Sequence, residues 1–171
     1  MKLFPLLALL VIACNENKTA AVTAENAARR TPPADTIVAS IRLKSNCIYC
    51  DLDGDGLKDT VQIVQHVRSR KSGLRITFGK NGKIDYLGLG KDILNQGFDD
   101  IDWAGIFKIA PRGTVYWNNV NEDGEILAAS QIKDKNKITL KNDGIFLHAD
   151  ESCGGGVIYY DNGAYKWIQQ E

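Results

Sequence analysis

The sequence predicts a mainly β fold, either an antiparallel sandwich or a partly open barrel. Short runs of β-branched and aromatic residues, with partial polar alternation, recur through residues 37–171. Turn pairs such as Asn81-Gly82 and Asp123-Gly124 separate these runs. No long stretch with helical periodicity lies between them. Strands at short spacing without intervening helices are typical of sandwiches and barrels, and the sequence does not choose between the two.

The predicted strands follow one another along the chain. Residues 36–43 and 60–67 are rich in β-branched side chains, and residues 74–78 alternate cleanly. The Asn81-Gly82 turn leads into a strand at 83–87, and residues 91–95 are predicted to form one short helical turn. Further strands are predicted at 113–117, 126–132, 137–140, 145–148, 157–160 and 165–169.

The N-terminus has the pattern of an export signal. Met1-Lys2 is followed by an apolar run from Leu3 to Ala13, which is shorter than the roughly 20 residues that a helix needs to cross a bilayer. The run ends in Val11-Ile12-Ala13-Cys14, which resembles the lipobox of bacterial lipoproteins. The resemblance implies that residues 1–13 are a signal peptide and that Cys14 becomes the lipidated first residue, carrying palmitate-like acyl chains. Several acyl chains on one residue give firm membrane attachment.

The segment after Cys14 is predicted to be a spacer. Residues 14–36 contain no aromatic residue and end near Pro32-Pro33, so they cannot bury enough apolar surface to offset the entropy of ordering. In the lipoprotein resemblance, Asn15 stands where an Asp would mark inner-membrane retention. We therefore expect a protein of the bacterial cell envelope, anchored by lipid to the outer membrane.

The rest of the chain, residues 37–171, has the length of one domain. The chain has 21 basic and 21 acidic residues, so charge gives no reason to expect nucleic acid as a partner. The expected ligand of the domain is a protein or a glycan, which the sequence does not identify.

One acidic motif points to metal chemistry. Residues 51–59 read D-x-D-x-D-G-x-x-D, and oxygen ligands at alternate positions of a tight loop converge on one point. Calcium is a hard cation that takes six to eight oxygen ligands. The predicted ligands are the carboxylates of Asp51, Asp53, Asp55 and Asp59 and the backbone carbonyl of Leu57.

The motif resembles the calcium loops of dockerin, thrombospondin type 3 and integrin-like FG-GAP modules. An EF-hand would place a bidentate Glu at the twelfth position, where this chain has Gln62, and a strand pattern follows instead of a helix. The resemblance covers residues 51–64 alone and implies a calcium-stabilised loop. A second segment, residues 119–124, has part of the spacing but is predicted to be a hairpin turn.

The cysteines of the domain leave several possibilities open. Export makes a disulfide expected, and we favour Cys50–Cys153 over Cys47–Cys50. The Cys47-Ile-Tyr-Cys50 spacing resembles a thioredoxin-type redox motif, but an acidic loop follows it, and nearby carboxylates oppose a thiolate. Cys47, Cys50 and Cys153 together with His148 would form a possible zinc set.

No catalytic set stands out in the sequence. Asp99, Asp100 and Asp102 beside Trp103 provide the carboxylates that a hydrolase of envelope polymers would need. A polar loop with a buried Trp explains the same residues. The sequence therefore favours a non-catalytic binding module, with a hydrolase at Asp99–Asp102 and a thiol–disulfide protein at Cys47 and Cys50 as alternatives.

Overall fold

A computed structural model describes residues 36–118, 120–121, 124–151 and 154–170. These residues belong to one compact unit, Ala34–Glu171. Within the described ranges, no helix is long and apolar enough to span a bilayer.

Five antiparallel strands form the first sheet, called sheet A. Its order is β1-β3-β4-β5, and β2 pairs with the same edge of β3 as β1 does. The segment between β1 and β2 leaves this edge at Ser40 and returns at Asn46, and both residues hydrogen-bond to Ile63. The strands are β1 (Ile37–Ala39), β2 (Cys47–Cys50), β3 (Asp59–His66), β4 (Ser72–Thr77) and β5 (Ile84–Gly88).

Four antiparallel strands form the second sheet, called sheet B, in the order β11-β10-β9-β6. They are β6 (Ile106–Ala110), β9 (Gly144–His148), β10 (Gly155–Asp161) and β11 (Ala164–Gln170). The long β10–β11 hairpin turns at Asn162-Gly163, where both residues have positive φ.

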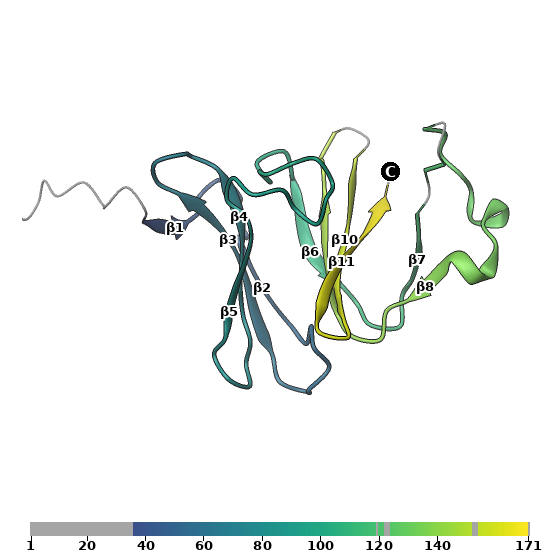
Figure 1. The fold of residues 1–171 in the computed structure, drawn as a ribbon, viewed down its shortest axis with the longest axis horizontal. Coiled ribbons are helices and arrows are strands. Elements are labelled where there is room, and N and C mark those ends of the chain that lie inside the picture. Colours follow the sequence, from purple (N-terminus) through teal and green to yellow (C-terminus); the bar gives the residue numbers. More distant parts are fainter. Residues whose placement is uncertain (1–35, 119, 122–123, 152–153, 171) are drawn as a thin grey trace, which may run out of the picture. The chain divides into compact units, whose positions relative to one another are not determined.

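The two sheets pack face to face around one core. Val61 and Ile76 of sheet A and Leu147 and Ile158 of sheet B are fully buried in it. Phe107 of β6 joins the same cluster at 8% exposure. Figure 1 shows sheet A on one side of sheet B, and this pairing of twisted sheets is a β-sandwich.

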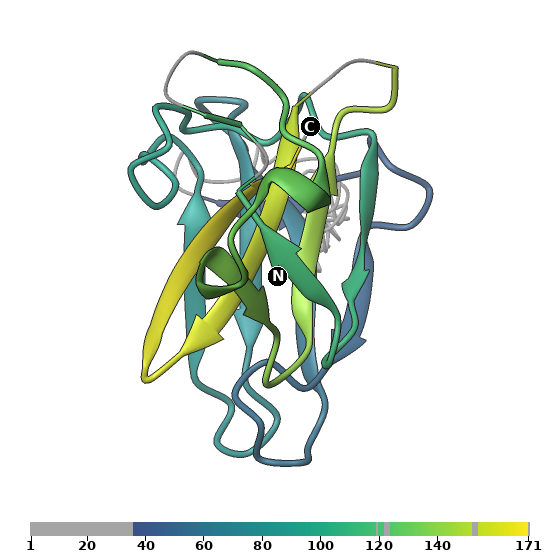
Figure 2. The same ribbon diagram turned by 90° about the vertical axis from the view of Figure 1, so that its right-hand side faces the viewer.

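A short ribbon covers the outer face of sheet B. It consists of β7 (Val115–Trp117) and β8 (Lys137–Thr139), with two 3₁₀ turns, η1 (Ala129–Gln131) and η2 (Asp134–Asn136), between them. A second apolar cluster lies beneath the ribbon, where Leu140 and Tyr116 pack with Val157 and Ile168. Figure 2 shows the ribbon in front of the yellow and light green strands of sheet B.

The predicted fold class is confirmed, and the structure selects the sandwich over the barrel. Most predicted strand positions also match the structure. The errors are strands that were missed, a strand that is shorter than predicted, and predicted elements that do not form. β2 and β6 were not predicted, although Ile106-Phe107-Lys108-Ile109 alternates well enough to signal a strand. The strand expected at 36–43 ends at Ala39.

Two predicted elements are wrong. Instead of a strand at 126–132, Ile126 makes one isolated bridge to Val120, and the chain then enters η1. The helical turn expected at 91–95 does not form, because Leu94 and Asn95 have φ of 53° and 61°. The described part of the 119–124 turn closes with Gly124 N–H donating to the Asn121 carbonyl at 3.1 Å.

Candidate metal site

The acidic motif forms a loop between β2 and β3 whose backbone is folded by its own carboxylates. Asp51 accepts hydrogen bonds from the N–H groups of Gly54 and Gly56 at 2.8 and 3.0 Å. Asp53 and Asp55 each accept from the N–H two residues further on. Such side-chain turns are a local property of Asp. Gly54 and Gly56 have φ of +79° and +87°, a conformation that glycine adopts without steric cost.

Leu52 and Asp59 fix the loop to the sandwich. The Leu52 side chain is buried in the core, whereas Asp51 and Asp53 are partly exposed. The Asp59 carboxylate is fully buried and accepts the N–H groups of Leu52 and Gly79 at 2.8 and 2.9 Å. It therefore joins the loop, β3 and the end of β4.

Three of the four predicted aspartates converge. One carboxylate oxygen from each of Asp51, Asp53 and Asp59 lies within 4.8 Å of the other two. Carboxylate oxygens have about four lone-pair sites per group, so an oxygen that accepts one N–H retains capacity for a cation. The donors are all hard oxygens, which suits a cation of the calcium or magnesium type.

The charges of this cluster are not compensated within the loop. Burial raises the pKa of the Asp59 carboxyl above its ordinary value, and the charges of Asp53 and Asp55 raise it further. The N–H groups of Gly79 and Leu52 act in the opposite direction. A bound cation would favour the ionised form, so the site has the electrostatic character of a cation site.

Asp55 lies differently from the other three predicted carboxylates. Asp55 is outside the converging group, and its Oδ1 accepts the Leu57 N–H at 2.8 Å. Its Oδ2 is buried and has no hydrogen-bond partner among the described residues. A buried carboxylate oxygen of this kind requires a partner, which a cation or a water would supply.

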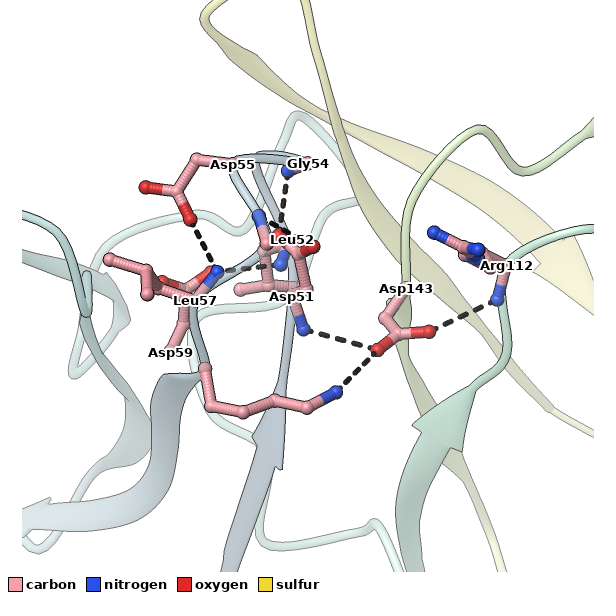
Figure 3. Close-up of polar contacts among 10 residues, drawn as sticks. Asp51, Leu52, Gly54, Asp55, Leu57, Asp59, Arg112 and Asp143 are labelled. Atoms are coloured by element: carbon pink, nitrogen blue, oxygen red, sulfur yellow. Dashed lines mark hydrogen bonds and ion pairs between the residues drawn. The ribbon is translucent and has the colours of Figure 1, made fainter.

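Residues next to the ends of strands β6 and β9 of sheet B complete the surroundings of the loop (Figure 3). The Asp143 carboxylate accepts the N–H of Asp51 at 3.1 Å and that of Arg112 at 3.1 Å. Lys58 pairs with it at 3.5 Å. The Asn142 side chain donates to the Leu52 carbonyl at 3.1 Å. The loop therefore joins the two sheets at one end of the sandwich.

Asp143 is held in its ionised form. Burial alone would raise the pKa of its carboxyl, but the N–H donors of Asp51 and Arg112 and the Lys58 ammonium hold that pKa below its ordinary value. Nothing in the residues around Asn142 and Asp143 predicts this contact. A polar pair before a glycine is too common to signal docking onto a loop 90 residues away.

The two described cysteines are free thiols on opposite faces of β2. Cys50 is fully buried, and burial, with Asp143 and Asp59 nearby, raises the pKa of its thiol to about 12. Cys47 is half-buried. Two side chains on opposite faces of one strand cannot bond to each other or bind one ion, so this arrangement opposes the Cys47–Cys50 disulfide and the zinc set.

The predicted Cys50–Cys153 disulfide stays a prediction, because Cys153 lies outside the described residues. Its described neighbour Gly154 lies at the His148 end of β9, whereas Cys50 lies beside Asp143 at the other end. Among the described residues, no group that includes Cys47, Cys50 or His148 converges as metal ligands do.

The carboxylates considered for hydrolysis act as anchors in this structure. Asp99 forms an ion pair with Lys71 at 2.9 Å, and Asp100 accepts the Ser72 N–H at 3.3 Å. Asp102 accepts the Ser72 hydroxyl and forms an ion pair with Arg42 at 3.4 Å. Together they attach the β5–β6 segment to the start of β4.

No protein-family model matches this chain, and no curated protein or solved structure is significantly similar to it. Cys14, Asn15 and the rest of the expected signal peptide and spacer, up to residue 35, lie outside the described residues.

Proposed function

We propose that this chain is a lipid-anchored lipoprotein of the bacterial cell envelope whose β-sandwich is stabilised by calcium and binds a protein or glycan without catalysis. One observation carries the proposal: the carboxylates of Asp51, Asp53 and Asp59 converge within 4.8 Å. They do so in the loop between β2 and β3, which holds the two sheets together through hydrogen bonds. A bound ion there would stabilise the whole domain. The lipobox at Cys14 supports the location.

Calcium fits the donor set better than the other common ions do. Zinc prefers sulfur and nitrogen ligands, and the nearest thiol, Cys50, is buried with a raised pKa. Magnesium requires a small octahedral site and usually keeps several waters. A loop of aspartates with one backbone carbonyl, Leu57, provides the larger and more adaptable shell that calcium accepts.

The proposed role of the ion is structural. Calcium modules outside the cell bind at about 10⁻⁴ to 10⁻³ M, which suits permanent occupancy where calcium is millimolar. Occupancy would offset the repulsion among four aspartates and would give the buried Asp55 Oδ2 a partner.

The test is calorimetry of the purified full chain in mild detergent, titrated with calcium and with magnesium. Asp53→Ala is the main variant, because its Oδ1 makes one weak hydrogen bond at 3.2 Å and its loss should spare the fold. Asp134→Ala is the matched control, since its exposed side chain lies in η2. We expect millimolar or tighter calcium binding that Asp53→Ala abolishes and Asp134→Ala retains. An absence of binding to the wild-type chain would overturn the proposal.

A further inference from the structure

A pocket of about 340 Å³ lies at the other end of sheet B from the acidic loop. β9 begins at Gly144, next to Asp143, and ends at His148, and Ala149 then lines the pocket. The other described walls come from the β5–β6 segment, from Gly154 and Gly155 at the start of β10, and from β11. The volume falls in the range of small-molecule sites.

Three aromatic side chains form the apolar wall of the pocket. The Phe98 ring lies against both indoles edge to face, with centroids 5.4 Å from Trp103 and 5.6 Å from Trp167. All three side chains are partly exposed. The Trp167 ring also packs closely against Gly156 of β10, where a Cβ would come within 2.2 Å of the ring's Cζ2. The aromatic surface is thus fixed before any ligand arrives.

The loop that presents Gln96 and Phe98 is held by hydrogen bonds within the loop. The Asp92 carboxylate accepts the N–H groups of Gln96 and Gly97 at 3.0 and 3.1 Å, and Ile93 N–H donates to the Phe98 carbonyl at 2.8 Å. Ile93 itself is fully buried. Two non-glycine residues with positive φ precede Gln96, and backbone strain of this kind is concentrated at binding and catalytic sites.

The polar groups of the pocket are neutral amides. Gln96 stands at the rim, and its Oε1 has no hydrogen-bond partner among the described residues. The Gln169 Oε1 accepts the Trp167 indole N–H at 2.9 Å, which orients both side chains. Among the described residues that line the pocket, none carries an ionisable side chain.

We propose that this pocket binds a neutral carbohydrate, with a sugar ring against the Trp103 and Trp167 indoles and its hydroxyls hydrogen-bonded to Gln96 and Gln169. A sugar ring has apolar C–H faces and a hydroxyl rim, which match aromatic faces and amides. A purely apolar ligand would leave the Gln96 Oε1 without a partner, and a charged one would find no counter-charge among the described lining residues. The inference rests on the proposed binding-module function and names its ligand class.

The test titrates the purified full chain with cellohexaose, maltohexaose and chitohexaose, and follows tryptophan fluorescence and calorimetric heat. Two of the three tryptophans line the pocket, so binding should change the emission. We expect at least one hexasaccharide to bind. Gln96→Ala and Trp103→Ala should each weaken that binding about tenfold, the equivalent of one 1.4 kcal/mol contact. Gln96 is exposed, so its variant keeps the fold.

Tyr49→Ala is the matched control, because Tyr49 is 62% exposed on β2, far from the pocket in sequence and on the other sheet. It should leave the affinity unchanged. The proposal is overturned if the wild-type chain binds none of the three sugars. It is also overturned if both pocket variants bind a sugar as tightly as the wild type does. A change in the protein's emission with an uncharged, tryptophan-containing peptide but with none of the three sugars would likewise overturn the proposal. Calcium binding is measured on the same samples, so failure at the pocket is distinguished from failure at the acidic loop.

Discussion

Asp51 and Asp143 exchange two hydrogen bonds across the sandwich. The Asp51 N–H donates to the Asp143 carboxylate at 3.1 Å, and the Asp143 N–H donates to the Asp51 carbonyl at 3.0 Å. Asp51 follows β2 of sheet A, and Asp143 precedes β9 of sheet B. This pair therefore couples the proposed calcium loop to the packing of the two sheets.

We expect Asp143→Ala to destabilise the domain by about 2–3 kcal/mol, because charge-assisted hydrogen bonds are worth about 1.5–3 kcal/mol. The Asp51 and Arg112 N–H groups would lose their acceptor. Urea unfolding in the presence of a chelator measures the loss without the contribution of calcium. Asp134→Ala, which removes an exposed ion pair with Lys137, should have a much smaller effect on the free energy of unfolding. Equal losses in the two variants would contradict the proposed coupling.

The pH dependence of stability should include a contribution from Asp161. Hydrogen bonds from Lys166 and Lys141 lower the pKa of its carboxyl. Because the folded-state pKa lies below the unfolded value of about 3.9, the stabilisation is present above that value and is lost as the pH falls through the folded pKa. The melting temperature of Asp161→Asn should lie below that of the wild type at pH 6, and the two should converge at the acid end. A difference in melting temperature that stays constant down to the acid end would contradict this contribution.

Gly156→Ala should displace the Trp167 indole. The new Cβ would lie 2.2 Å from the ring and 2.7 Å from the Ile168 carbonyl, so side chain or backbone must move, at a cost of about 1–3 kcal/mol. Thermal melting and tryptophan emission report the change. Gly82→Ala is the control, since a Cβ there meets no atom within 4 Å and its positive φ alone costs about 1–2 kcal/mol. An unchanged emission spectrum in Gly156→Ala would show that the indole does not lie on this glycine.

The two described cysteines should differ in reactivity. Cys50 is buried and the pKa of its thiol is raised to about 12, so iodoacetamide at pH 8 should leave it unmodified in the native protein. Cys47, which is half-buried, should react first, and both should react in urea. Peptide mass mapping assigns each site. Native labelling of Cys50 at the rate of Cys47 would be inconsistent with this structure.

Cys14→Ser should abolish the proposed lipid anchor. We expect the wild-type chain to incorporate labelled palmitate and to sediment with membranes, and the variant to do neither. Cys47→Ser is the matched control, because it removes a cysteine of the folded domain and should retain both properties. Palmitate incorporation that persists in Cys14→Ser would place the lipid elsewhere or refute lipidation.

The sequence alone determined the β class and the convergence of aspartates in the acidic loop. Both depend on near neighbours: alternation with period two and glycine turns specify strands, and Asp51, Asp53 and Asp59 converge within nine residues of chain. Turns also depend on near neighbours, so the positions of the predicted turns located most strands of the two sheets. Local preference did not reveal β2, which is only four residues long and lies beside the acidic loop.

Only the tertiary structure decided which distant residues meet. Sheet packing and register brought Asp143 onto the Asp51 loop, and they brought Phe98 and Trp103 together with Trp167. The same packing placed Cys47 and Cys50 on opposite faces of a strand. Contacts between segments 60 to 90 residues apart depend on how whole sheets twist and stack, and no local pattern of residue types contains that information.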